Sequence, residues 1–210
     1  MLTYSTTVSS ISVLPKDRCK CKHTPQAVSG TVVGMEQNKS IETSRLILRV
    51  YSVEDFNEMY EMWSEPAVTR YMGSKRFSRE DVWARLLRYA GTWALFGYGF
   101  WVIRDKQSGQ FIGEVGFHNL QRETKPPLGD CPELGFGLIS AAHGKGFATE
   151  AARAVLDWAD LAWGERETVC MIAPDNVPSL RIANKLGYVE TAQAEYNGAP
   201  MILFKRRGSS

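Results

Sequence analysis

Residues 132–153 read PELGFGLISAAHGKGFATEAAR and predict a strand, a tight turn and a helix in direct succession. The strand is the mostly apolar run Glu133 to Ile139, and the turn that follows is rich in Ala and Gly. From Gly146 onward, apolar residues recur at three- and four-residue spacing, which predicts a helix with one buried face. A helix that follows a strand through such a turn has unpaired N–H groups at its start. The rest of the chain is expected to be organised around this element.

The turn itself has the features of an anion site. Gly144 and Gly146 allow a ligand to approach the backbone closely, because no Cβ stands in the way. Free amides and the positive end of the helix dipole suit a phosphate or a diphosphate. The spacing is not that of a P-loop, and the stretch Gly144 to Thr149 lacks the third glycine of a dinucleotide fingerprint. Small residues can also serve close packing alone, so the turn by itself leaves both interpretations open.

The segment HGKGFA, residues 143–148, resembles the Gln/Arg-x-x-Gly-x-Gly/Ala motif that binds acyl-CoA in the GNAT superfamily of N-acetyltransferases. The continuation ATEAA is similar to the branch that contains ribosomal-protein N-terminal (Ser/Ala) acetyltransferases and many small-amine acetyltransferases. The resemblance covers Ile41 to Lys205. One departure is His143, where Gln or Arg is usual. An imidazole can still donate to a phosphate, but its charge near neutral pH depends on its surroundings.

A second stretch, NVPSLRIANKLGY at residues 176–188, is similar to the superfamily's Asn-x-x-Ser and Lys-Leu-Gly-Phe/Tyr element. In that family the asparagine lies against the pantetheine arm, and the helix borders the thiol of CoA. Carried over by position, the resemblance assigns these contacts to Asn176 and Ser179. Taken alone, Asn176 is equally well explained as a helix N-cap and Ser179 as a first-turn residue. The presence of both motifs in one chain favours the cofactor interpretation.

The resemblance implies direct attack of an amine on acetyl-CoA, without an acyl-enzyme. The thioester carbonyl is expected at backbone N–H groups near Leu138, and Ser179 is the candidate to hydrogen bond to the departing thiolate. Glu133 is ranked first as the general base, because family members often carry Glu there. Glu114 and His118 are the alternatives, and each carboxylate could equally be an ordinary strand-end residue. The residues expected to bind the cofactor are Leu138, Ile139, His143, Gly144, Lys145, Gly146, Phe147, Ala148, Thr149, Asn176 and Ser179.

Composition limits the classes of partner. The 210 residues are 44% hydrophobic and 23% charged, as in a soluble globular protein of one domain. Residues 1–40 contain five basic and two acidic residues, so the remainder carries a net charge of −1. A nucleic-acid binder would concentrate positive charge on its folded part, so no nucleic acid is expected. The longest uncharged run, Tyr89 to Ile103, is shorter than the roughly 18 residues that a membrane helix requires, and no membrane partner is expected.

The four cysteines do not form a metal-binding pattern. Cys19 and Cys21 precede His23 but lack the spacing and the second ligand pair of a zinc site, so no metal is expected. Cysteines scattered in this way suit a reducing cytoplasm. The N-terminus has no basic start followed by an apolar block, so it is not a secretory signal. These features predict a cytoplasmic protein, either a monomer or a homodimer.

The rest of the chain predicts an α/β (α+β) fold with a GNAT-like mixed, mostly antiparallel seven-stranded sheet and helices on both faces. Residues 1–40 are expected to be a poorly ordered tail, and 41–207 a single acetyltransferase domain. Strands are expected at 45–49, 99–104, 111–117, 133–139, 168–173, 188–192 and 200–205, and helices from 52, 78, 146 and 176. An aromatic wall of Trp83, Trp93, Tyr98 and Trp101 is a candidate for the acceptor pocket, but most of these side chains are expected to be core.

Two functions from different classes follow. The first is an N-acetyltransferase that moves an acetyl group from acetyl-CoA to a primary amine, either a protein N-terminus or a small molecule. The second is a non-catalytic sensor or scaffold that only binds CoA. The second function stays open because His143 replaces the usual Gln or Arg of the motif and because the residues do not identify one general base.

Overall fold

Eight strands form one sheet, in the order β1-β2-β3-β4-β5-β6-β8-β7, in the computed structural model, which describes residues 39–71 and 77–209. Neighbouring strands are antiparallel except β5 and β6, which are parallel. The strands are β1 (Ser40–Glu42), β2 (Leu46–Val50), β3 (Phe100–Asp105), β4 (Phe111–His118), β5 (Glu133–Leu138), β6 (Glu167–Ile172), β7 (Val189–Tyr196) and β8 (Ala199–Arg207). The mixed, mostly antiparallel α/β fold is confirmed.

The strand beyond the seven expected is β1. It pairs with β2 from Ser40 opposite Arg49 to Glu42 opposite Ile47, and the Trp101 indole N–H donates to the Lys39 carbonyl at 3.0 Å. Three residues are too few to show a period of two, so the pattern could not reveal this strand. Most of the predicted tail, residues 1–38, lies outside the described residues.

Helices begin within one residue of the predicted starts at 52, 78, 146 and 176, and the structure also contains two short helices that were not predicted, at 66–69 and 140–142. The helices are η1 (Val53–Asp55), α1 (Phe56–Ser64), α2 (Pro66–Thr69), α3 (Arg79–Phe96), η2 (Ser140–Ala142), α4 (Phe147–Trp163) and α5 (Val177–Lys185). A capping box opens α3, where the Asp81 amide donates to the Ser78 hydroxyl at 3.1 Å and the Ser78 amide donates to the Asp81 carboxylate at 2.9 Å. The extended backbone of Glu65, before Pro66, separates α1 from α2.

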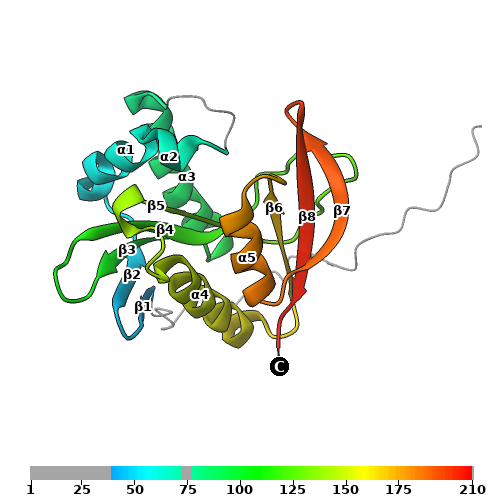
Figure 1. The fold of residues 1–210 in the computed structure, drawn as a ribbon. Coiled ribbons are helices and arrows are strands. Elements are labelled where there is room, and N and C mark those ends of the chain that lie inside the picture. Colours follow the sequence, from blue (N-terminus) through cyan, green and yellow to red (C-terminus); the bar gives the residue numbers. More distant parts are fainter. Residues whose placement is uncertain (1–38, 72–76, 210) are drawn as a thin grey trace, which may run out of the picture.

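Helices cover both faces of the sheet (Figure 1), with α1 to α3 on one side of β1 to β5 and α4 on the other. The α4 side contains the larger apolar core, which includes Trp93, Tyr98 and Trp101. The Trp93 and Trp101 rings meet edge to face, with centroids 4.7 Å apart. These three side chains are therefore core, as was expected for most of the aromatic wall, and do not line an acceptor pocket. Trp83 is partly exposed on α3 and packs edge to face on Phe56.

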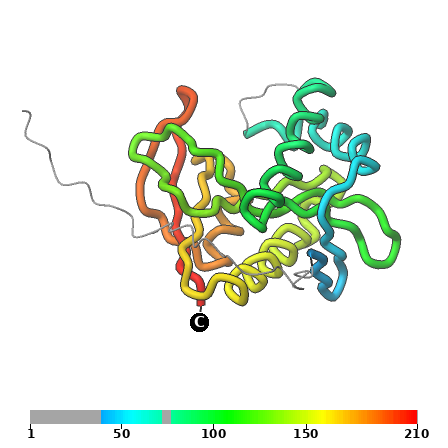
Figure 2. The backbone as a smooth tube through the Cα atoms, turned by 180° about the vertical axis from the view of Figure 1, so that it is seen from behind, coloured from blue at the N-terminus to red at the C-terminus, as the bar shows by residue number. Residues whose placement is uncertain are grey.

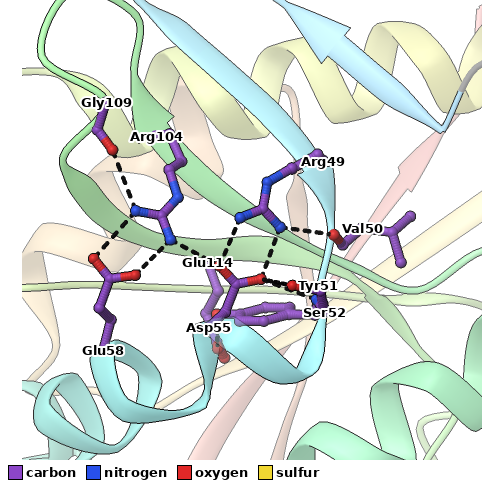
Figure 3. Close-up of polar contacts among 9 residues, drawn as sticks. All are labelled: Arg49, Val50, Tyr51, Ser52, Asp55, Glu58, Arg104, Gly109 and Glu114. Atoms are coloured by element: carbon purple, nitrogen blue, oxygen red, sulfur yellow. Dashed lines mark hydrogen bonds and ion pairs between the residues drawn. The ribbon is translucent and has the colours of Figure 1, made fainter.

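Buried Asp55 ties the start of α1 to two strands (Figure 3). It accepts hydrogen bonds from the guanidinium groups of Arg49 on β2, at 2.6 and 2.7 Å, and of Arg104 on β3, at 2.7 Å. Arg104 also pairs with Glu58 of α1. Burial opposes the charge of Asp55, but the two guanidiniums and the Ser52 amide outweigh burial and hold the pKa of Asp55 far below its ordinary range. The network fixes the start of α1 against β2 and β3.

Replacement of Asp55 by Ala is expected to lower the free energy of unfolding by about 3 kcal/mol, because two arginines lose their shared partner. Since the folded-state pKa is lowered, this stabilisation is present above the ordinary carboxyl pKa and is lost as the pH falls through the lowered pKa. Urea unfolding at pH 7 and in acid measures both effects. Glu61→Ala, at an exposed position of the same helix, is the control. A loss at pH 7 no larger than that of the control would contradict the prediction.

Candidate active site

The backbone amides of Phe136 and Leu138 point away from β4. The Ile139 amide donates to the Ile112 carbonyl at 3.1 Å, so these two residues form a hydrogen-bonded pair of the β4–β5 ladder. In an antiparallel ladder such pairs alternate with pairs that exchange no backbone hydrogen bonds. Leu138 opposite Gly113 is of the second kind, and so is Phe136. Their N–H groups therefore point from the other edge of β5, within the plane of the sheet, toward β6.

On that side β5 and β6 diverge. Within the described residues, their pairing is confined to Glu133 opposite Val169, near the start of both strands, where the Val169 amide donates to the Pro132 carbonyl at 3.0 Å. Beyond that point, the amides of Phe136 and Leu138 face the gap in the pairing. This places the predicted carbonyl-binding amide of Leu138 at the divergence.

A glycine bends β4 beside the same point. Gly113 has a φ of +152°, and a Cβ there would lie 2.2 Å from the Gly137 carbonyl oxygen, so no other residue fits without a backbone shift. The register between β3 and β4 changes at Ile103 and Arg104, so β4 contains a bulge there. The bulge and Gly113 both lie beside Leu138, which is opposite Gly113 in the β4–β5 pairing.

The turn between β5 and α4 has the geometry that its sequence predicts. Gly144 and Gly146 are left-handed, with φ of +74° and +82°, and Gly146 is the N-cap of α4 without a side-chain capping bond. A Cβ at Gly144 would meet no atom within 4 Å. Lys145 lies between these glycines, and Phe147, Ala148 and Thr149 form the first turn of the helix. The first N–H groups of α4 are thus not covered by a capping side chain, which fits a diphosphate.

His143 has a contact that the sequence did not predict. Its Nε2 lies 3.0 Å from the Leu138 carbonyl oxygen. Because a carbonyl only accepts, Nε2 carries the proton of this hydrogen bond. The other ring nitrogen can donate to a phosphate only when the imidazole is protonated. The role expected for His143 as a phosphate donor is therefore restricted to its charged form, and the amides of the turn are the main donors.

Arg45 is the site residue that sequence reasoning missed. It extends from the start of β2 to the turn, where its Nη1 donates to the Lys145 carbonyl at 3.0 Å and its Nε to Glu150 at 2.7 Å. The guanidinium carbon lies 4.5 Å from the centroid of the Phe147 ring. Thr43 also donates to Glu150, at 2.6 Å. About 100 residues separate these partners in the chain, so no local pattern indicates the contact.

Arg45→Ala is expected to raise the KM for acetyl-CoA about tenfold with little change in kcat, because the turn loses both the anchor of Lys145 and a nearby positive charge. Initial rates at varied acetyl-CoA, together with calorimetric Kd values, measure the effect. Lys106→Ala removes a cation from the adjacent β3–β4 turn, where it pairs with Glu42, and serves as control. Equal effects of the two variants would show that Arg45 acts only through net charge.

Asn176 and Ser179 lie together at the start of α5. The Asn176 side-chain oxygen accepts a hydrogen bond from the Ser179 amide at 3.2 Å. This is the helix N-cap contact that explains Asn176 without a cofactor. Both residues are partly exposed. Arg153 of α4 donates to the Lys185 carbonyl at 3.0 Å, so α5 is fastened beside α4. The cap leaves the Asn176 amide nitrogen and the Ser179 hydroxyl available to a ligand.

Glu114 is fully buried on the α1–α3 side of β4. Its carboxylate accepts hydrogen bonds from Tyr51 at 2.9 Å, from Tyr89 at 2.5 Å and from the Trp63 indole at 3.4 Å. Burial raises the pKa of Glu114, more than the charge of Arg85 and these hydrogen bonds lower it. A carboxyl group with a raised pKa is a stronger base than an ordinary one.

Glu133 has the opposite environment. It is 5% exposed, and it accepts a hydrogen bond from Arg122 Nε at 2.7 Å, with His118 Nε2 at 3.4 Å. Burial opposes the charge, but His118 and Arg122 outweigh it and lower the pKa of Glu133 to about 2. A carboxylate held in this way is a weak proton acceptor.

Position along the strand also separates the two carboxylates. Glu114 is directly opposite Gly137, next to Leu138, whereas Glu133 is opposite His118 at the far end of β5. Five residues of strand span roughly 17 Å, so Glu133 begins far from the Leu138 amide. The distance of Glu133 from the Leu138 amide and its lowered pKa both argue against Glu133 as the general base, and they favour the alternative, Glu114.

A groove of about 400 Å³ opens between the β4–β5 loop and the β7–β8 hairpin. Lys125 of the loop forms a bridge with Glu195 of β7, and Figure 2 shows the loop running alongside the hairpin. The groove is lined by Lys125, Pro174, Gln193, Ala194, Pro200, Met201 and Ile202. Pro174 follows β6 and shortly precedes α5, so the groove adjoins the Asn176 end of the candidate site.

No group of three or more His, Cys, Asp or Glu side chains in residues 39–71 and 77–209 could hold a metal ion. In the same ranges, no helix combines the length and apolar character needed to cross a bilayer.

The chain matches the family model described as an acetyltransferase (GNAT) domain over residues 45–189. It is 28% identical over 152 residues to the uncharacterized N-acetyltransferase p20 of Bacillus licheniformis, covering 71% of this chain and 82% of that protein. A putative GnaT-family acetyltransferase structure from Bordetella pertussis is 31% identical, with a TM-score of 0.72, and the match covers 80% of this chain and 98% of that one. The ribosomal-protein-S5-alanine acetyltransferase of Vibrio fischeri shares the fold at 23% identity, a TM-score of 0.63 and coverage of 80% and 96%.

Proposed function

The chain belongs to the GNAT acetyltransferase family, and from this premise we propose that it transfers an acetyl group from acetyl-CoA to a primary amine by direct attack. The observation that carries the proposal is the left-handed glycine turn at the start of α4, directly after the strand that diverges from β6. Unpaired helix amides and backbone amides along the divergence are suited to the diphosphate and the pantetheine arm, respectively.

The proposed roles follow from this arrangement. Acetyl-CoA supplies the acyl group as a thioester. The amides of Gly146 and the first turn of α4 bind its diphosphate, and the amide of Leu138 stabilises negative charge that develops on the thioester oxygen. Asn176 lies along the pantetheine arm. Ser179 hydrogen bonds to the departing thiolate, since a serine hydroxyl is too weak an acid to protonate it fully.

The proposed base is Glu114, in place of the first-ranked Glu133. An amine acceptor arrives largely as an ammonium ion and must lose a proton before it can attack. Tyr51 and Tyr89 already donate to Glu114, so the proton reaches its carboxylate through one of these hydroxyls or a water. Glu133, which pairs with Arg122 and His118, holds the β4–β5 loop in position.

The test is an acceptor screen with acetyl-CoA and detection of the free thiol. The panel contains small amines, amino acids and peptides with free N-termini. At least one acceptor is expected to release CoA, and Ser179→Ala is expected to lower kcat about tenfold with the Kd for acetyl-CoA unchanged. Ser209→Ala, near the C-terminus, is the matched control. Tight CoA binding with no thiol release from any acceptor would instead support the non-catalytic sensor.

A further inference from the structure

Three arginines gather on the α3 side of β4 and β5. Arg85 and Arg88 are one turn apart on α3, and Arg122 belongs to the β4–β5 loop. We refer to these three residues as the arginine cluster. Arg85 and Arg122 are half-buried, and Arg88 is exposed. Burial of the guanidinium and the charges of Arg85 and Arg122 lower the pKa of Arg88.

Arg85 packs against aromatic rings, and its guanidinium has a hydrogen-bond donor without a partner among the described residues. Its guanidinium lies 4.0 Å from the centroid of the Trp63 ring and 5.1 Å from that of Phe77. One nitrogen, Nη1, donates to the Tyr89 hydroxyl at 3.4 Å. The buried Nε has no hydrogen-bond partner among the residues that the structure describes. Native proteins rarely leave a buried donor unpaired, so this Nε is a donor that an acceptor group of a ligand could use.

Neither buried acid of this region forms a direct ion pair with Arg85 or Arg88 among the residues that the structure describes. Glu133 is taken up by Arg122, which also lies 4.8 Å from the centroid of the Tyr196 ring. Glu114 reaches Arg85 only through the hydroxyl of Tyr89. In residues 39–71 and 77–209, neither Arg85 nor Arg88 forms an ion pair with a carboxylate. The cluster therefore offers positive charge to a ligand beside the proposed base.

We propose that the amine acceptor carries a carboxylate, which the arginine cluster binds while the amine faces Glu114. This inference rests on the proposed function. A single hydroxyl separates Glu114 from Arg85, so an ammonium and a carboxylate on the same small molecule match the two charges of the site. The planar guanidinium suits a carboxylate because it can donate two parallel hydrogen bonds. A polyamine would bring only positive charge to these arginines and would be repelled.

The experiment compares each amino acid with its carboxamide, in which the carboxylate is replaced at nearly the same size. Thiol release gives kcat/KM for both members of each pair, with spermidine as a cationic acceptor. The carboxylate form is expected to be preferred at least tenfold. Arg88→Gln is expected to reduce kcat/KM for the carboxylate about tenfold, mainly through KM, and to leave the carboxamide unchanged. The preference then disappears.

Arg79→Gln is the matched control on the same helix. Arg79 lies 4.7 Å from the centroid of the Phe56 ring and donates to Asn57, outside the cluster. This variant loses the same charge and is expected to retain the preference. Arg85→Gln is a second variant of the cluster. If it fails to fold because its ring contacts are lost, the exposed Arg88 still carries the test.

The outcomes separate this inference from the proposed function. Equal rates for carboxylates and carboxamides, or a preference that survives Arg88→Gln, would overturn the carboxylate inference while leaving acetyl transfer intact. A preference for spermidine would do the same. Release of no thiol from any acceptor, in the presence of bound CoA, would overturn the proposed function itself.

Discussion

Replacement of Gly146 by Glu is expected to weaken binding of acetyl-CoA at least a hundredfold. Gly146 has a φ of +82°, where a residue with a Cβ is strained by about 1–2 kcal/mol. The new carboxylate would also stand at the N-cap of α4, where it competes with the diphosphate for the first N–H groups and repels it. Calorimetry gives the change in Kd, and thermal unfolding with and without acetyl-CoA gives the loss of ligand stabilisation.

Gly109→Glu provides the matched control. Gly109 has a φ of +71°, and a Cβ there would meet no atom within 4 Å, so the same substitution introduces similar strain without a clash. It lies in the turn between β3 and β4 and is not part of the turn that begins α4. This variant is expected to lose stability but to be stabilised by acetyl-CoA as strongly as the parent protein. A Gly146→Glu protein that responds to acetyl-CoA like this control would show that the turn does not bind the diphosphate.

The second large effect is expected from Glu114→Gln, which should lower kcat by a factor of about 10² to 10³, the range typical for loss of a general base. The Kd for acetyl-CoA should change little, because Glu114 lies on the face of β4 opposite α4. In the parent protein, kcat/KM should fall as the pH falls through the raised pKa of Glu114. This limb therefore lies at a higher pH than an ordinary carboxyl group would give. Rates measured across pH 5–9 test the assignment.

Glu133→Gln distinguishes the two carboxylates. It is expected to lower kcat less than about tenfold, but to reduce stability, because Arg122 and His118 lose their partner. The pKa of Glu133 is lowered to about 2, so its stabilising contribution is present above the ordinary carboxyl pKa and is lost as the pH falls toward 2. A loss of kcat as large as that of Glu114→Gln, without loss of stability, would restore Glu133 as the base.

The elements that could be predicted are those with local signals. Such signals act within a few residues and can therefore be recognised in the sequence. Examples are the capping box at Ser78, the proline at 66 and the glycines at 144 and 146. The strand–turn–helix and the order of the elements followed from such signals. Strand β1 did not, because three residues are held by pairing with β2 and not by their own pattern.

The candidate site was predictable in its backbone and not in its side-chain partners. Turn amides follow from glycine positions, but the choice between Glu114 and Glu133 depends on the β4–β5 register and on which arginines reach them. Arg45 contacts Glu150, 105 residues away in the chain. Such contacts are products of the tertiary fold, and a single sequence without a three-dimensional frame does not specify them.

The parallel pairing of β5 with β6 has a thermodynamic consequence. It joins two antiparallel blocks, β1 to β5 and β6 with β7 and β8, and its ladder is short. A molecule bound where β5 and β6 diverge touches both blocks, so its binding free energy stabilises the association of the two blocks. At a concentration one hundred times its Kd, such a ligand adds about 2.7 kcal/mol to the free energy of unfolding. In a cell that keeps acetyl-CoA abundant, the junction between the blocks would thus be reinforced by the substrate itself.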